Sequence, residues 1–398
     1  MVRIDKNNST IRDSHFPLPK GWRWVRLGEV CEVIMGQSPP GHTYNKNGQG
    51  LPFYQGKIEF GQVYPLEPST WCTEPKKIAE PDDVLLSVRA PVGPTNLCNK
   101  RCCIGRGLAA IRPKKGTNPL FILYYLRLVE EKIAEIGRGS TFGAIKKGDI
   151  ESILIPEPPS LEQQKRIAAK IQELMQEVER ARAACEKQLE AAKALPAAYL
   201  RQVFESEEAE RWERRRLGNV CEIIMGQSPP SHTYNREGTG IPFLQGKIDF
   251  GQFHPTASVW CTKPLKTAVV GDVLISVRAP VGPTNIADQQ YCIGRGLAAI
   301  RPLNFINTWF LLFYFRSIEK LIYEEYGGRG STFGAMTKRH LENLEIPLPP
   351  PSVQHRIASE LKEKMAQVDK LRASIEKQLE AINALPQAIL RKAFIGEL

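Results

Sequence analysis

The chain of 398 residues has no apolar run near the ~20 residues that a membrane-spanning helix requires. Its first residues, MVRIDK, lack the apolar core that follows the basic start of a signal peptide. We therefore expect a protein of the cytoplasm with no membrane partner. Hydrophobic residues make up 42% and charged residues 24%, as in globular proteins, and the length exceeds that of one compact core.

Catalytic signatures are missing as well. The chain contains no Asn/Asp-Pro-Pro-Tyr motif, no Walker loop and no paired His/Cys metal spacing. None of its nine cysteines forms a Cys-x-x-Cys pair, and three of them recur at matching places, Cys31, Cys72 and Cys103 against Cys221, Cys261 and Cys292. We interpret them as small buried hydrophobic residues, with a zinc site as the less favoured alternative. We expect no catalytic residue, no metal and no cofactor.

The formal charge of +11 is compatible with a polyanionic partner, but its distribution is mild. Residues 1–160 carry an excess of six basic residues, whereas residues 205–351 carry an excess of one. Many proteins are this basic, so charge alone does not predict nucleic-acid binding.

The chain is one unit written twice, with a period near 190 residues. CEVIMGQSPPGHTYN, LLSVRAPVGPTN, CIGRGLAAIRP and GRGSTFGA begin at residues 31, 85, 103 and 137, and they recur, with few changes, at 221, 274, 292 and 328. EKQLEA stands at residue 186 and again at 376. This period is longer than any solenoid repeat, so each copy is a whole domain followed by a connector.

Each copy begins with Gly- and Pro-rich sequence interrupted by short β-branched runs such as residues 83–88. One helix is predicted from Asn118-Pro119 and its counterpart from near Asn307. These features predict two similar globular domains of mixed α/β (α+β) class. We expect domains at residues 1–158 and 205–350.

The connectors, 159–204 and 351–398, have a helical pattern. Ser160 and Gln163 form a capping box, and about 34 residues follow before Pro196 or Pro386, or roughly 50 Å of helix. Apolar residues with steps of three and four predict one packing stripe on each helix: Ile167, Ile171, Leu174 and Val178, and Ile357, Leu361, Val368, Leu371 and Ile375.

Two such stripes predict an antiparallel coiled coil that separates the globular domains and relates them by an internal pseudo-twofold axis. The alternative is that each helix lies on its own domain. The basic residues of these helices alternate with glutamates, which is typical of a solvated helix face.

Arg, Lys, Gln, Ser and His side chains presented from loops are the groups that contact DNA. In the first copy the candidates are Gln37, Ser38, His42, Tyr44, Gln55, Lys57, Arg89, Arg106, Arg138, Ser140 and Lys146. In the second copy they are Gln227, Ser228, His232, Tyr234, Gln245, Lys247, Arg278, Arg295, Arg329, Ser331 and Lys338.

Each candidate segment has a plainer interpretation. The polar residues around His42 could serve only their own turns. Arg89 and Arg278 lie in apolar segments, where an arginine is either paired with a carboxylate or directed at a ligand. The Gly-Arg-Gly at residues 105–107 is too short for a dinucleotide loop, and the Gly-rich loop after Gly137 is either a phosphate-binding nest or an ordinary turn.

The ordered motifs LPKGWRWVRLGEV, MGQSP, LLSVRAPVG, GSTFGAI and IPEPPSLEQQKRIAAKI, with the closing LPQAILRKAFIGEL, resemble the specificity subunits of type I restriction-modification systems. The resemblance covers essentially the whole chain. It implies two target recognition domains that read a split site in double-stranded DNA. It also implies helices that dock two modification subunits, which carry the adenine methyltransferase activity, and restriction subunits that add ATP-driven translocation and cleavage.

The chain departs from this family in one respect, because its two domains are nearly copies whereas those of relatives commonly diverge. Two equal readers related by a twofold axis predict a palindromic split target, with half-site centres roughly 15 base pairs apart for a ~50 Å spacer. Differences such as Tyr54 against Leu244 would break that symmetry. Two alternatives remain: an enzyme in its own right, and a free-standing DNA-binding regulator.

Overall fold

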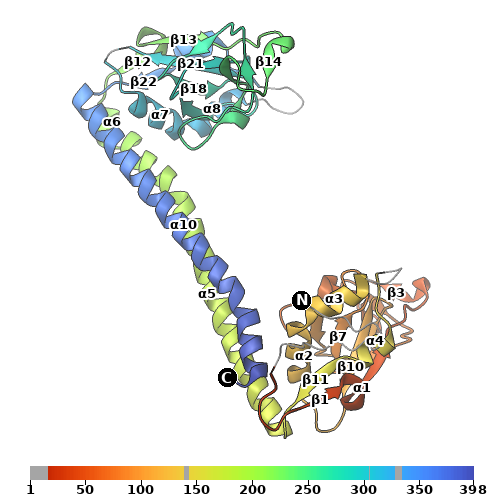
Figure 1. The fold of residues 1–398 in the computed structure, drawn as a ribbon. Helices are drawn as coiled ribbons and strands as arrows, with labels where there is room; N and C mark the ends of the chain where they lie inside the picture. Colours follow the sequence, from red (N-terminus) through yellow and green to blue (C-terminus); the bar gives the residue numbers. More distant parts are fainter. Residues whose placement is uncertain (1–16, 139–142, 304, 328–333) are drawn as a thin grey trace. The chain divides into compact units, whose positions relative to one another are not determined.

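The computed structural model describes residues 17–138, 143–303, 305–327 and 334–398, and it divides into two compact units (Figure 1). The first unit consists of residues 1–185 and 378–398, and the second of residues 186–377. Each unit therefore contains one sheet-rich domain and parts of both long helices. The mixed α/β class is confirmed. Among the described residues, no helix is both long and apolar enough to cross a membrane.

The first domain contains three sheets. A two-stranded antiparallel sheet pairs β1 (Arg23–Arg26) with β11 (Leu154–Glu157). A four-stranded antiparallel sheet has the order β2 (Cys31–Met35), β10 (Leu108–Pro113), β7 (Val84–Ser87), β8 (Thr95–Leu97). A five-stranded sheet has the order β3 (Tyr44–Asn45), β5 (Trp71–Cys72), β4 (Leu51–Tyr54), β9 (Cys102–Ile104), β6 (Ile78–Ala79). In it only β4 and β9 run parallel.

Short helices complete this domain: α1 (Leu27–Val30), α2 (Pro119–Leu128), α3 (Glu130–Arg138) and α4 (Lys147–Glu151), with 3-10 turns η1 (Gly41–Thr43) and η2 (Lys57–Glu59). Helix α2 begins where the sequence predicts, because the Asn118 side chain accepts a hydrogen bond from the Phe121 backbone N–H at 2.9 Å and proline follows at the first helical position.

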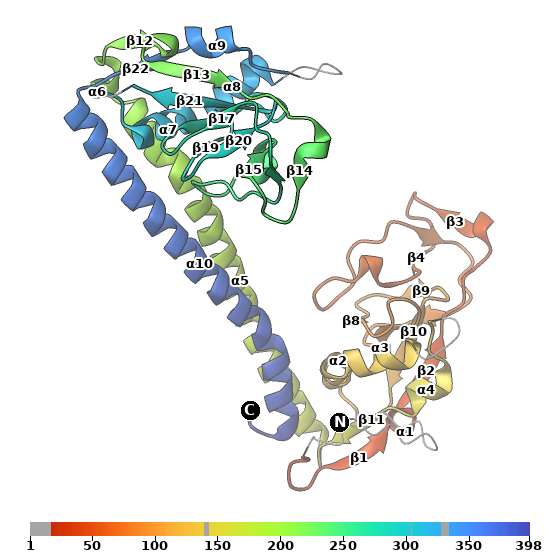
Figure 2. The ribbon, with the colours of Figure 1, turned by 45° about the horizontal axis from the view of Figure 1, so that its top comes forward.

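The four-stranded sheet is buried on both faces, and alternation along β7 shows why. Val84 and Leu86 face a core that includes α2, whereas Leu85 faces a second core with Tyr54 and Ile104 of the five-stranded sheet. Figure 2 shows α2 and the five-stranded sheet on opposite sides of the first domain. The loops of the five-stranded sheet are thereby held on a rigid double-sheet support.

The second domain repeats this plan. Its strands are β12 (Arg214–Arg216), β13 (Cys221–Met225), β14 (Tyr234–Asn235), β15 (Ile241–Leu244), β16 (Trp260–Cys261), β17 (Thr267–Ala268), β18 (Val273–Ser276), β19 (Thr284–Ile286), β20 (Tyr291–Ile293), β21 (Leu297–Pro302) and β22 (Glu345–Pro347). Its helices are α6 (Glu207–Glu210), α7 (Thr308–Ser317), α8 (Glu319–Tyr326) and α9 (Lys338–Asn343), with turns η3 (Leu217–Asn219), η4 (Ser231–Thr233) and η5 (Lys247–Asp249). The strand orders match those of the first domain.

The two long helices are α5 (Leu161–Phe204) and α10 (Pro351–Ile395). In the first unit Ile167 and Ile171 of α5 share one core with Leu390 and Phe394 of α10. In the second unit Leu200 of α5 shares a core with Ile357, Leu361 and Met365 of α10, together with Phe310 and Phe313 of α7. The start of each helix thus packs with the end of the other, and both pack on a domain. The two helices therefore pack against each other, as the apolar stripes predict, and each also packs on a domain, as the alternative prediction has it.

The observed stripe on α10 differs from the predicted one at Leu371, which is 46% exposed and does not pack as expected. Leu361, Met365, Val368 and Ile375 are buried and follow one another in steps of four, three and seven residues. In this series the position between Val368 and Ile375 falls on Arg372. Leu371, one residue earlier, lies about 100° away from the stripe around the helix. On α5, Ile167 and Ile171 are buried, whereas Leu174 and Val178 are half-buried.

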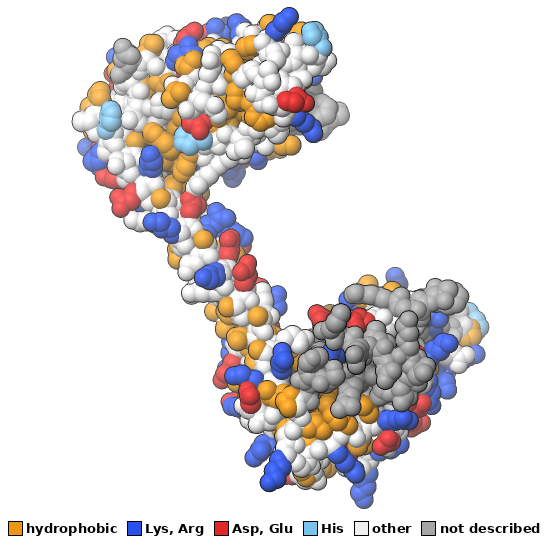
Figure 3. All heavy atoms as spheres, viewed as in Figure 1, with side chains coloured by type: hydrophobic (Ala, Val, Ile, Leu, Met, Phe, Trp, Pro, Cys, Tyr) orange, Lys and Arg blue, Asp and Glu red, His pale blue; other side chains and the backbone are white. Residues whose placement is uncertain are grey.

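The helices also continue through Pro196 and Pro386 rather than ending before them. A proline inside a helix removes one backbone hydrogen bond, but the turns after it are anchored by buried side chains, Leu200 in α5 and Leu390 in α10. On the face drawn in Figure 3, basic and acidic side chains are interspersed along the helices, as the alternating sequence predicts.

Candidate nucleic-acid interface

Five of the predicted DNA-contacting residues of the first copy line one pocket of about 470 Å³. They come from four segments that are distant in the sequence: Ser38, Gln55 and Lys57, Arg89, and Arg106. Gly56, Ile58, Ser87, Ala90, Pro91 and Gly107 complete the lining. The pocket lies where the loops after β2, β4, β7 and β9 meet.

Backbone contacts bring these loops together. The Gln37 N–H donates to the Ile104 carbonyl at 3.0 Å, and the Val88 N–H donates to the Gly107 carbonyl at 2.9 Å. A side chain at Gly107 would place its Cβ 2.2 Å from the Gln55 carbonyl oxygen, so only glycine allows this approach. The weak Gly-Arg-Gly motif therefore has a packing reason here, since it presents Arg106 beside Gln55.

The pocket is cationic. Its lining contains the cations of Lys57, Arg89 and Arg106 and no carboxylate. None of the three forms an ion pair with a described residue, and all three are exposed. The nearby acid Glu130 has its pKa raised by burial, an effect that the charges of Arg127 and Lys57 oppose.

A structural arginine of the same domain gives the contrast. Arg112 contacts both carboxylate oxygens of the buried Asp83 at 2.9 and 2.8 Å, and this hydrogen bonding raises the pKa of Arg112. Arg301 and Asp272 repeat the pair in the second copy. Arg89 and Arg278 are exposed and have no such carboxylate among the described residues, so the paired interpretation does not apply to them there; their contact with a ligand stays a prediction.

The second copy contains the same set of residues. All eleven lining positions hold the identical residue type: Ser228, Gln245, Gly246, Lys247, Ile248, Ser276, Arg278, Ala279, Pro280, Arg295 and Gly296. The contacts repeat as well, because the Ser38 hydroxyl accepts from the Arg106 N–H at 3.4 Å and Ser228 accepts from the Arg295 N–H at 3.3 Å. The two copies thus present the same chemical groups.

The predicted residues of the neighbouring turn are placed differently. Gln37, His42, Gln227 and His232 are exposed but do not line the described pocket. Tyr44 is half-buried, its hydroxyl donates to the Pro39 carbonyl at 2.8 Å, and its ring lies 4.8 Å from that of Phe53. Tyr234 does the same with Pro229 and Phe243. Both tyrosines therefore stabilise their turns, which is the plainer interpretation.

The Gly-rich loop candidates are mostly not described. Ser140, Arg329 and Ser331 lie outside the described residues, as does the side chain of Arg138. Lys146 is exposed and precedes α4, where its N–H donates to Asp149 at 2.8 Å. Lys338 begins α9 and forms an ion pair with Glu342 at 3.6 Å, which matches Lys147 and Glu151 in the first copy rather than Lys146.

The structure adds two side chains that the sequence-based prediction missed, Ser87 and Ile58. The Ser87 hydroxyl donates to the Pro91 carbonyl at 2.8 Å and so holds the loop that carries Arg89. Ile58 lies between Lys57 and Glu59 and is almost fully exposed. Both residues are identical in the two copies of the repeat, and this identity was the available signal in the sequence. It does not show, however, that a side chain is exposed.

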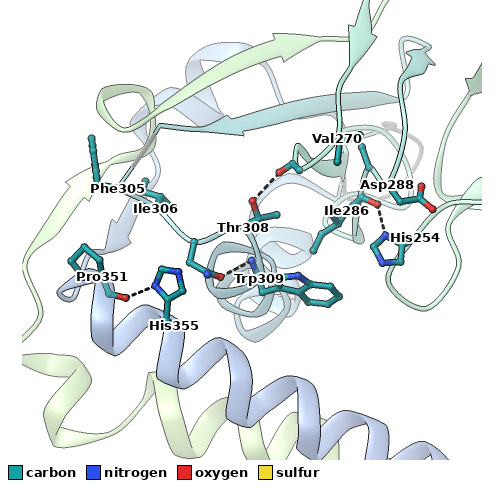
Figure 4. A pocket seen from close by; sticks show the side chains of 13 residues that line it. His254, Val270, Ile286, Asp288, Phe305, Ile306, Thr308, Trp309, Pro351 and His355 are labelled. Carbon is teal, nitrogen blue, oxygen red and sulfur yellow. Dashed lines mark hydrogen bonds between the residues drawn. The ribbon is translucent and has the colours of Figure 1, made fainter.

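A second pocket, of about 560 Å³, lies in the second unit between the second domain and the start of α10 (Figure 4). His254, Asp288, Trp309 and His355 line it, and His254 and His355 bond backbone carbonyls at 3.0 and 2.7 Å. The first copy has Tyr64, Asn99, Leu120 and Lys165 at these places. This pocket is not repeated, so it cannot carry a function shared by both copies.

Metal chemistry finds no support in the described part of the chain, where no group of three or more His, Cys, Asp or Glu side chains could hold an ion. All nine cysteines are buried, and none of them forms a disulfide bond. Burial raises the pKa of the Cys31 and Cys221 thiols to about 12. They are packed as small hydrophobic residues, as the sequence predicts.

The family model of the type I restriction modification DNA specificity domain matches the chain twice, at residues 19–190 and 209–383. Among curated relatives, a putative type I restriction enzyme specificity subunit, MjaX, of Methanocaldococcus jannaschii is 36% identical over 317 residues, covering 74% of this chain and 72% of the relative. The EcoDI specificity subunit of Escherichia coli is 25% identical, and the alignment covers 96% of this chain and 89% of the relative.

Solved structures agree. A chain from a study of complex assembly and conformational transition of the type I R-M system superposes with a TM-score of 0.79 at 37% identity, covering 96% of this chain and all of the other. The crystal structure of the HsdS subunit from Thermoanaerobacter tengcongensis gives a TM-score of 0.71 at 35% identity, covering 98% of this chain and all of the other.

Proposed function

Since this chain belongs to the specificity subunits of type I restriction-modification systems, we propose that it reads a split double-stranded DNA site with the pocket of the first copy and the matching residues of the second. Recognition is assigned to residues 1–158 and 205–350, and the spacing between half-sites to residues 159–204 and 351–398. In this role the chain catalyses nothing itself. It docks two modification subunits, which methylate the DNA, and restriction subunits where the system includes them.

The observation that carries the proposal is that all eleven residues lining the pocket of the first copy recur unchanged at the matching positions of the second. The arginine, lysine and glutamine side chains of this set are exposed and have no ion-pair partner within the described ranges, and such groups bind base edges and phosphates. Two readers with the same groups bind the same half-sequence, so the proposed target is a palindrome interrupted by a spacer. Gln55, Arg89 and Arg106, with Gln245, Arg278 and Arg295, are the proposed base-reading residues, and Lys57 and Lys247 contact phosphates.

The test is to express the chain with the modification subunit of its host in cells without other methyltransferases and to map modified adenines by long-read sequencing. The expected motif is an inverted repeat around a spacer. Arg89→Ala should relax one half of the motif and Arg278→Ala the other, so that both variants give the same asymmetric motif read from opposite strands.

Arg101→Ala is the matched control, because it removes an exposed arginine of the same domain that pairs with Glu80 at 3.2 Å, outside the pocket. This variant should keep the symmetric motif. Two unrelated half-sites in the wild-type motif would contradict the palindrome, and an unchanged motif in both pocket variants would contradict the assignment of the site. Tight specific binding by the chain alone, with no effect of modification subunits, would indicate a free-standing regulator.

A further inference from the structure

Ile58 and Ile248 are the most exposed large hydrophobic side chains among the described residues, at 85% and 92%. They occupy the same position in the two copies, in turns η2 and η5. The other exposed large hydrophobic residues of the domains have no such counterpart; Leu66 is matched by Thr256, and Leu303 by Lys114. An isoleucine exposed once is ordinary surface, whereas the same exposure in both copies indicates a shared use.

The fold holds both side chains outward. The Phe60 N–H donates to the Lys57 carbonyl at 2.9 Å, and Phe250 and Lys247 repeat this bond at 2.9 Å. Phe60 and Phe250 then pack against the cores between the two larger sheets. In the second copy the Asp249 side chain also accepts from the Gln245 N–H at 2.7 Å. With the turn closed and anchored in this way, the isoleucine cannot fold back into the core.

Ile58 shares its pocket with cationic and polar side chains and with the apolar Ala90 and Pro91. It lines the same pocket as Gln55, Lys57, Arg89 and Arg106, and no carboxylate lines that pocket. The charged side chains that line this pocket with Ile58 are all cations, which bind polyanions, whereas the centre of a protein-docking surface is depleted of charged residues.

The major groove of DNA offers a partner for each of these side chains. Arginine recognises guanine and glutamine recognises adenine there by paired hydrogen bonds, and the apolar group that a base pair presents in that groove is the C5-methyl of thymine. An isoleucine beside arginine and glutamine therefore completes a set that distinguishes thymine from cytosine.

We propose that Ile58 and Ile248 each contact the C5-methyl group of one thymine in their half-site and so specify an A·T pair there. The proposal rests on the proposed function, because it requires that both pockets face DNA. It assigns a base-reading role to a residue type that forms no hydrogen bond with a base.

The experiment uses the complete methyltransferase complex and duplexes that carry the mapped target, with each thymine of the half-sites replaced in turn by uracil, which lacks only the methyl group. At one thymine per half-site, uracil should weaken binding by the wild-type complex by about three- to tenfold. Ile58→Ala should abolish the uracil effect in one half-site alone, and Ile248→Ala in the other.

Leu66→Ala is the control, because Leu66 is an exposed apolar residue of the same domain, 58% exposed, outside the pocket lining. It should leave every uracil effect in place. Both isoleucine variants should assemble with the modification subunit as the wild type does.

Three results would overturn the inference while leaving the proposed function intact: no thymine of the half-sites at which uracil weakens binding, uracil effects that persist in both variants, or a loss of assembly without DNA, which would place Ile58 at a protein interface. Absence of any methylation motif with the wild-type chain would instead refute the proposed function itself.

Discussion

Phe394, near the end of α10, lies edge-on to Phe121 of α2 in the first unit, with ring centroids 5.0 Å apart. Phe204, near the end of α5, takes the same place in the second unit, 5.5 Å from Phe310 of α7. Tyr125 and Tyr314 complete the two aromatic clusters at 5.2 and 5.5 Å. Each domain is therefore completed by the end of a long helix, and the helix that completes the first domain comes from the other end of the chain.

Replacing Phe394 by alanine should destabilise the first domain alone. The ring is fully buried, so the loss of its contacts and the cavity left behind should cost about 3–5 kcal/mol. Hydrogen exchange should accelerate in α2 and stay unchanged in α7, and Phe204→Ala should give the reverse. Leu371→Ala, at an exposed site of α10, is the control and should alter neither. Equal loosening of both domains would contradict this division.

A fragment of residues 206–398 should form a dimer. Phe394 of one copy can then occupy, on the other copy, the place that Phe204 holds in the full chain, and the apolar stripe of each helix is covered. Light scattering should show twice the fragment mass, and the dimer should restore methylation of the palindromic site when mixed with modification subunits. Phe394→Ala in the fragment should return it to a monomer. A wild-type fragment that stays monomeric and inactive would refute the predicted exchange.

Lys57→Ala should lower the salt dependence of DNA binding by the assembled complex, because Lys57 is the proposed phosphate contact of the pocket. Each lysine or arginine that neutralises a phosphate releases about one counterion, so a cation in contact with the backbone contributes ~0.9 to the slope of log affinity against log salt. Arg89→Ala removes a proposed base-reading side chain, so affinity should fall and sequence preference should relax, while the slope changes less. Arg101→Ala should change neither quantity. No change in either for Arg89→Ala would place it outside the interface.

The cysteines should be unreactive in the folded protein. All nine are buried, and burial raises the pKa of Cys31 and Cys221 to about 12, against 9.0 for a free thiol. A thiol reagent at pH 8 should therefore modify nine groups in guanidinium and close to none in the native state. Because the thiols of the unfolded chain ionise first, the free energy of unfolding should fall as the pH rises from 9 toward 12. Rapid native labelling, or stoichiometric zinc in the purified protein, would contradict this interpretation.

Much of the architecture follows from local signals in the sequence. The repeat predicts two equivalent domains, the Asn118-Pro119 pair predicts the start of α2, and Ser160 predicts the start of α5, where its hydroxyl accepts from the Gln163 N–H at 3.2 Å. The apolar steps of three and four predict the two long helices. These features depend on neighbours within a few residues, or on comparison of one half of the chain with the other, so no tertiary information is needed.

The pocket could not be assembled from the sequence in the same way. Ser38, Gln55, Arg89 and Arg106 are each plausible DNA contacts, but only the pairing of β2, β4, β7 and β9 decides that they share one lining, whereas His42 does not. The predicted stripe on α10 is wrong at Leu371 for a similar reason. Helical periodicity allows either Leu371 or Arg372 at this place, and in the folded chain Arg372 is half-buried whereas Leu371 is exposed.

The sequence by itself determined the duplication, the helices and the family, since these are properties of pattern. Only the tertiary structure decided which side chains lack partners. Long-range contacts pair Arg112 with Asp83, whereas Arg89 has no carboxylate partner among the described residues, and the closed turn before Phe60 leaves Ile58 in solvent. Both outcomes depend on residues far apart in the chain, which no local pattern records.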